Sequence, residues 1–159
     1  MSRTVTFGES CQYDSAPYNS EDVNKLFGLS FGFGGVHHNS ARFGWRWSKA
    51  DQCIELLAYV YNRGERNWNT QLRFPVVAQV PLGVQLDCRL LYMESNDAWN
   101  YARNGAQYVF TVTHPGGVDV AWVPAPAAIA SYGLTHGLYF GGSQPAPHDI
   151  HVIIDRHGK

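Results

Sequence analysis

Several features that assign a protein to a broad class at first sight are missing from this sequence. No run of about 18 apolar residues is present, so we expect no transmembrane helix. Residues 1–9 lack the apolar segment of a signal peptide. The three cysteines, Cys11, Cys53 and Cys88, form no C-x-x-C pair and are odd in number, which favours free thiols over disulfides. We therefore expect a cytoplasmic protein that binds no membrane.

Charge is scarce as well. Asp, Glu, Lys and Arg make up 16% of the 159 residues, and the formal net charge is −1. A protein that coats a nucleic-acid polymer needs a basic excess, so we expect no such polymer as a partner. A near-neutral total still leaves room for a local cationic pocket that binds one small anion. The length predicts a single domain over residues 1–159.

Helical periodicity is weak, and the chain contains neither an internal repeat nor a low-complexity tract. Apolar and polar residues instead alternate in short runs between Gly, Pro, Asn and Asp, which is typical of many short strands. The predicted strands cover 3–7, 27–33, 40–48, 52–61, 69–80, 84–93, 106–113, 118–123, 137–141 and 149–155. A helix is expected to start near Ser20, and a helical turn is expected over 126–132.

Ten strands in one small domain predict an all-β fold, an antiparallel, jelly-roll-like β-sandwich. The strands are long and their connections are uneven, which favours the sandwich. A lipocalin-like barrel is the alternative, but the regular hairpins that ring closure needs are not evident.

One strand carries both a core anchor and a cationic face. Residues 40–48 place Ser40, Arg42 and Arg46 at even positions. Phe43, Trp45 and Trp47 stand at odd positions between them. Successive side chains of a strand point to opposite faces, so the aromatic set is expected in the core and the polar set on the other face.

The next strand fixes which residues meet on that polar face. Residues 52–61 alternate Ile54, Leu56, Ala58 and Val60 with Glu55, Leu57, Tyr59 and Tyr61. The first set belongs in the core, and a two-residue turn at Ala50-Asp51 then sets the register. That register predicts three cross-strand pairs: Arg46 with Glu55, Arg42 with Tyr59, and Ser40 with Tyr61. A longer loop with a bulge would shift these partners.

The adjacent histidines His37 and His38 are the natural place to look for a metal. Adjacent residues in an extended chain point apart, and the other five histidines have no ligand spacing relative to this pair. A metal site needs three or four convergent ligands. We therefore expect no metal and no cofactor.

Non-catalytic binding is the favoured function. The planar guanidinium group of arginine donates paired hydrogen bonds to phosphate or carboxylate, and aromatic rings pack against a nucleobase or a sugar ring. We expect a small polar or anionic ligand, with a phosphate-bearing nucleotide-type molecule preferred and a carbohydrate close behind. The candidate ligand-binding residues are His37, His38, Ser40, Arg42, Arg46, Tyr59, Tyr61, Trp68 and Trp99.

Two other functions stay open. In an enzyme, a lyase or hydrolase, His38, Arg42 and Tyr59 would act as acid–base and charge-stabilising groups. In a structural or assembly subunit, the aromatic patches would form a homo-oligomer interface.

Overall fold

The structure, a computed structural model, describes residues 1–13, 22–32, 35–67, 74–94, 105–126, 133–141 and 145–156. These ranges contain eleven β-strands and a single 3-10 turn, η1 (Glu9–Cys11), and no α-helix. The helix expected to start near Ser20 is wrong over the described residues, because 22–23 are irregular and a strand begins at Asn24, whose backbone pairs with Trp45. The helical turn expected over 126–132 lies outside the described residues, apart from its first residue.

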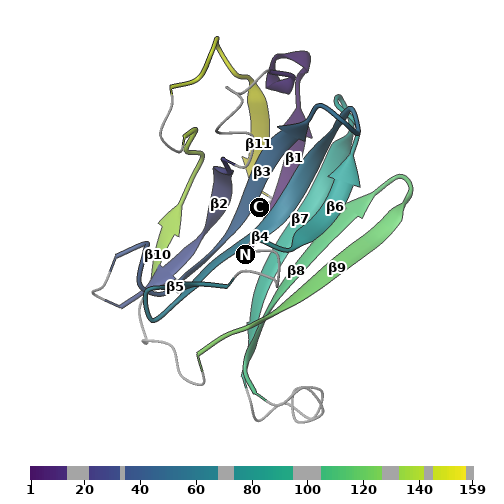
Figure 1. The fold of residues 1–159 in the computed structure, drawn as a ribbon. Helices are drawn as coiled ribbons and strands as arrows, with labels where there is room; N and C mark the ends of the chain where they lie inside the picture. Colours follow the sequence, from purple (N-terminus) through teal and green to yellow (C-terminus); the bar gives the residue numbers. More distant parts are fainter. Residues whose placement is uncertain are drawn as a thin grey trace.

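The strands form two antiparallel sheets that pack face to face (Figure 1). The first sheet contains, in spatial order, β11 (Val152–Arg156), β1 (Ser2–Phe7), β7 (Gln85–Met93), β8 (Gln107–His114) and β9 (Gly117–Pro124). The second contains β10 (Gly133–His136), β2 (Asn24–Phe31), β3 (Ser40–Ser48), β4 (Cys53–Asn62) and β5 (Glu65–Arg66), with β6 (Val76–Val80) also paired to β4. The sheets do not close into a barrel, which confirms the β-sandwich prediction.

The core lies between the sheets and follows the predicted alternation. Ile54, Leu56, Ala58 and Val60 of β4 are fully buried. On β3, Phe43 and Trp45 are fully buried too, whereas Trp47 is only partly buried at the margin of the core. Period-two patterning therefore assigns the two faces of this hairpin correctly.

Some predicted strand limits are wrong. The strand predicted over 137–141 lies earlier, at β10, and Tyr139 makes only an isolated bridge with Lys25. Gly137 follows β10 directly and Gly141 has a φ of 134°, so the extended run is interrupted at both ends. β2 begins at residue 24 rather than 27, and β11 at 152 rather than 149. Of the strand predicted over 69–80, residues 76–80 form β6, 74–75 are not strand, and 69–73 lie outside the described residues.

The non-core face of β4 is also buried, although the alternation led us to expect much of such faces to meet solvent. Leu57, Tyr59 and Tyr61 are 1%, 6% and 5% exposed. With Val23 and Phe74 they form a second apolar cluster on the outer side of the sheet. The polar residues of β3 therefore lie in a sheltered environment.

A substitution at Gly28 tests how tightly β2 and β3 approach. A Cβ at this position would lie 2.2 Å from the Ala41 carbonyl oxygen and 2.5 Å from the Arg42 Cα, and both are backbone atoms that cannot move aside easily. Gly28→Ala should lower the free energy of unfolding by about 1–3 kcal/mol or more, as overpacked cores do. Urea denaturation measures it. Gly137→Ala is the matched control, because nothing lies within 4 Å of its Cβ, and an equal loss there would contradict the steric explanation.

Candidate functional site

The outer face of the second sheet brings residues from four strands into one line. In the observed register His136 of β10 stands opposite Gly28 of β2, Gly28 opposite Arg42 of β3, and Arg42 opposite Tyr59 of β4. Directly opposite residues project from the same face of a sheet. The pairing therefore places a histidine, an arginine and a tyrosine side by side, with a gap at the glycine.

The predicted hairpin register is confirmed. Arg42 pairs with Tyr59, Arg46 with Glu55, and Ser40 with Tyr61. The turn spans residues 49–52, four residues rather than two, with Gln52 at a φ of 52°. Ser48 still pairs with Cys53, so the longer turn closes on the same register.

A pocket of about 650 Å³ opens over this line of residues. Its walls come from β2, β3, β4, β5, β10 and the segments that follow residues 35 and 136. The lining residues are Lys25, Val36, His37, Arg42, Tyr59, Tyr61, Arg66, His136, Gly137, Leu138, Tyr139 and Gly141. This volume falls within the range of ordinary small-molecule sites.

Arg42 is the central charge of the pocket. It is 6% exposed, and its guanidinium carbon lies 4.9 Å from the centre of the Tyr59 ring. Its Nε and Nη2 atoms are buried and have no hydrogen-bond partner among the residues that the structure describes. Burial lowers the pKa of the guanidinium. An arginine in this state holds charged donors that a ligand can satisfy.

Two further cations lie on the same walls. Lys25 is 9% exposed, and its Nζ donates to the carbonyl oxygens of Val23 (2.6 Å) and Gly141 (2.9 Å). The Arg66 Nε donates to the Tyr61 hydroxyl at 2.7 Å. The described lining contains neither aspartate nor glutamate, so the pocket is a local positive region in a chain whose net charge is −1.

The two histidines of the pocket differ in setting. His136 Nε2 and the Ser30 hydroxyl are 2.6 Å apart. Burial and the nearby Arg42 charge lower the pKa of His136, which favours the neutral imidazole. His37 is exposed, and its ring packs edge-on against Tyr61 with 5.2 Å between the centroids. His37 therefore belongs to the rim and His136 to the wall.

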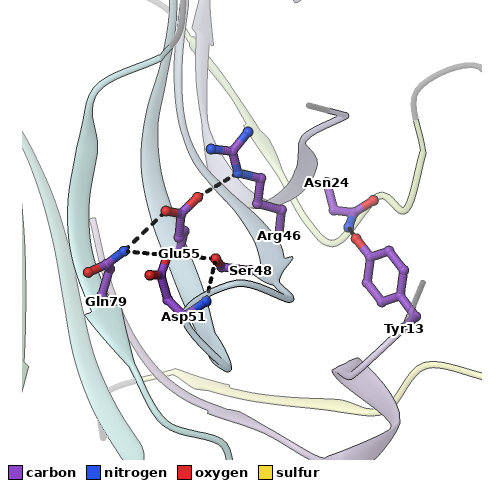
Figure 2. Close-up of polar contacts among 7 residues, drawn as sticks. All are labelled: Tyr13, Asn24, Arg46, Ser48, Asp51, Glu55 and Gln79. Carbon is purple, nitrogen blue, oxygen red and sulfur yellow. Dashed lines mark hydrogen bonds and ion pairs between the residues drawn. The ribbon is translucent and has the colours of Figure 1, made fainter. Parts of the chain in front are cut away.

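Arg46 lies on the same face as Arg42 but has a carboxylate partner. Figure 2 shows its guanidinium pointing toward Glu55, with 2.6 Å between Nε and Oε2. Gln79 donates to the other oxygen of Glu55 at 3.2 Å. The predicted pairing of Arg46 with Glu55 is thus present, and Arg46 does not line the pocket.

The predicted binding residues separate into three groups. His37, Arg42, Tyr59 and Tyr61 line the pocket, whereas His38, Ser40 and Arg46 do not. Ser40 is buried and its hydroxyl donates to the Val36 carbonyl at 2.6 Å, and His38 is exposed. The structure therefore does not bring His38 into the pocket with Arg42 and Tyr59. Trp68 and Trp99 lie outside the described residues.

Sequence reasoning missed Lys25, Arg66, His136 and Tyr139. A signal for Arg66 was present: Gly64 follows Arg63 in a two-residue hairpin turn, and both have positive φ values, 86° and 53°. Lys25 precedes the strand predicted over 27–33, and it lies next to a bulge between Lys25 and Phe27. His136 and Tyr139 reach the site through long-range pairing with β2, which no local pattern indicates.

Within the described ranges no three His, Cys, Asp or Glu side chains converge as metal ligands would. No helix in those ranges is long and apolar enough to cross a membrane. The chain matches no known protein-family model, no curated protein and no solved structure.

The two arginines of β3 should respond oppositely to removal of their charge. Arg42→Met removes a buried charge that has no carboxylate partner in the part of the chain that the structure describes, and it keeps most of the volume. Stability in ligand-free buffer should therefore stay equal or rise by about 1 kcal/mol. Arg46→Met leaves Glu55 without its cation and should cost about 1–3 kcal/mol. Urea denaturation of both variants measures this, and loss of the fold in Arg42→Met would identify Arg42 as structural.

Proposed function

We propose that this protein binds and sequesters a small anionic molecule of the phosphate-bearing nucleotide type in the Arg42 pocket, without catalysing a reaction on it. The observation that carries the proposal is the buried Arg42 guanidinium. Its Nε and Nη2 atoms have no partner among the described residues, and they are costly to keep away from water unless something accepts their hydrogen bonds. A phosphate or carboxylate supplies both the acceptors and the opposite charge.

The balance of donors and acceptors favours an anion over a neutral sugar. Arginine and lysine side chains only donate hydrogen bonds, and three of them line the pocket. No carboxylate or side-chain amide accompanies them in the described lining. Sugar hydroxyls donate as well as accept, so a carbohydrate would find few acceptors on these walls. Phosphate oxygens only accept, and they match this lining.

The aromatic rim supports a ligand that is larger than inorganic phosphate. Tyr61 and His37 pack edge to face at one part of the rim. Tyr139 is 60% exposed at another and Leu138 lies beside it. Flat aromatic surfaces next to a cationic centre suit a nucleobase joined to a phosphate, and a pocket of about 650 Å³ has room for both.

Arg42→Met should abolish nucleotide binding while the protein stays folded. Loss of two charge-assisted hydrogen bonds at about 1.5–3 kcal/mol each implies an affinity at least about 100-fold weaker. Isothermal titration with nucleoside monophosphates measures it, and thermal unfolding checks the fold. Arg89→Met is the matched control, because Arg89 is exposed on β7 of the other sheet, and its affinity should equal that of the wild type.

The same titration separates the ligand classes. Inorganic phosphate should bind more weakly than a nucleoside monophosphate, and the free nucleoside more weakly still. Tight binding of the free nucleoside or of a neutral monosaccharide, undiminished in Arg42→Met, would contradict the anion site.

Affinity should fall as the pH rises through about 8. Burial and the charges of Arg42 and Arg66 lower the pKa of Lys25 to about 8, against an opposing effect of Asp22. Above that pH the amine is neutral and no longer attracts an anion, so affinity should drop by up to about tenfold per pH unit. The charged and titratable groups that face Lys25 are Asp22, Arg42, Tyr59, Arg66 and Tyr139.

Titrations between about pH 7 and 9 test this dependence, since a phosphate with its second pKa near 6 keeps its charge over that range. Lys25→Arg keeps a cation at every pH and should bind with a flat profile. An equally steep profile in Lys25→Arg would show that another group is responsible.

A further inference from the structure

Lys25 is held in an unusual position for a lysine. Its backbone N–H and C=O both bond to Tyr139 at 2.8 Å, and it stands opposite Gly44 of β3. The side chain ends at two carbonyl oxygens, those of Val23 and Gly141, on the pocket wall. Backbone and side chain together fix the nitrogen at one place beside Arg42, whereas most lysines extend into solvent.

The surroundings make the neutral, nucleophilic form of the amine accessible near pH 8. Burial and the Arg42 charge are the two largest causes that lower the pKa of Lys25, to about 8. Lowering the pKa of a lysine by desolvation and a neighbouring cation leaves more of the amine unprotonated, and this is a known way to activate the nucleophile. The neutral amine keeps two N–H groups, enough for both carbonyl bonds, and its lone pair is left for an electrophile.

We propose that Lys25 forms an imine with small aldehydes or α-keto compounds that carry an anionic group, with the anion bound by Arg42. This inference rests on the proposed function for its anion site and adds a covalent step at a second residue. Arg42 supplies the binding of the anionic end. The carbonyl end then lies within the same pocket as the Lys25 nitrogen, which raises the effective concentration of the reacting groups.

The step balances without another reactant. The nitrogen lone pair forms a bond to the carbonyl carbon, and the carbonyl π electrons move to oxygen. The nitrogen then loses a proton and the oxygen gains one, which gives a carbinolamine. The nitrogen lone pair then forms the second C–N bond as the hydroxyl leaves, and the remaining N–H proton passes to the departing hydroxide, so that amine and carbonyl become a neutral imine and water. When the imine nitrogen takes up a proton from solvent, it has one N–H for the carbonyl oxygen of Val23 or Gly141.

Reductive trapping tests the proposal with a clean internal reference. The chain has three lysines, Lys25, Lys49 and Lys159, and Lys49 is exposed in the β3–β4 turn. The folded protein is incubated with glyoxylate and cyanoborohydride at about pH 8, and peptide mapping measures the carboxymethyl group on each lysine. Lys25 should react at least about tenfold faster than Lys49, because its own pKa is lowered to about 8 and because Arg42 binds the glyoxylate carboxylate within the same pocket.

Two variants and a neutral probe complete the design. Arg42→Met should reduce trapping at Lys25 at least about fivefold, as expected for loss of a charge-assisted contact. Acetaldehyde, which has no anionic group for Arg42 to bind, should show a smaller preference for Lys25 over Lys49 than glyoxylate does. Lys25→Arg should abolish trapping there and still bind phosphate at pH 7.

The possible failures are distinguishable. Trapping at Lys25 no faster than at Lys49, with nucleotide binding intact, overturns the imine and leaves the proposed function standing. Rapid trapping that Arg42→Met does not reduce overturns the role given to Arg42. Absence of both trapping and anion binding overturns the proposed function as well.

Discussion

The outer face of the second sheet depends on one close approach, that of the Gly28 backbone to Arg42. A side chain at position 28 would collide with backbone atoms of β3, so the two strands can carry a buried arginine between them only because a glycine stands opposite. The guanidinium then lies over the Tyr59 ring, which offsets part of the cost of burying its charge. The guanidinium also lines the pocket, and Lys25 and Arg66 lie on the same walls.

Arg42 and Arg46 show how one strand can carry two arginines with different roles. They have the same alternation and the same face, but Arg46 meets Glu55 across the hairpin and Arg42 meets Tyr59. A carboxylate neutralises the first, whereas an aromatic ring only shelters the second. Positive charge is thus concentrated at one end of the face in a protein of nearly balanced total charge. A cluster of like charges in a pocket is typical of binding sites.

Much of this hairpin could be predicted and little of the rest of the site could. Apolar and polar residues alternate along the two predicted strands, 40–48 and 52–61, and a short turn joins them. Because one face of each strand must enter the core and the loop is small, few registers are possible. The predicted pairs of Arg42 and Arg46 follow from these registers. Lys25 escaped prediction because a bulge interrupts β2 beside it. Tyr59 and Tyr61 were placed on the correct face, but their burial depends on Val23 and Phe74, which come from distant parts of the chain.

By itself the sequence determined the all-β class, the two faces of the β3–β4 hairpin and the position of Arg42 on the outer one, because side-chain alternation is a local property of an extended chain. Only the tertiary structure decided that Lys25 meets the Gly141 carbonyl, 116 residues away, and that Ser30 meets His136, 106 residues away. These contacts follow from which strands become neighbours in a sheet. Period-two patterns are alike in every strand, so they do not indicate which strands become neighbours.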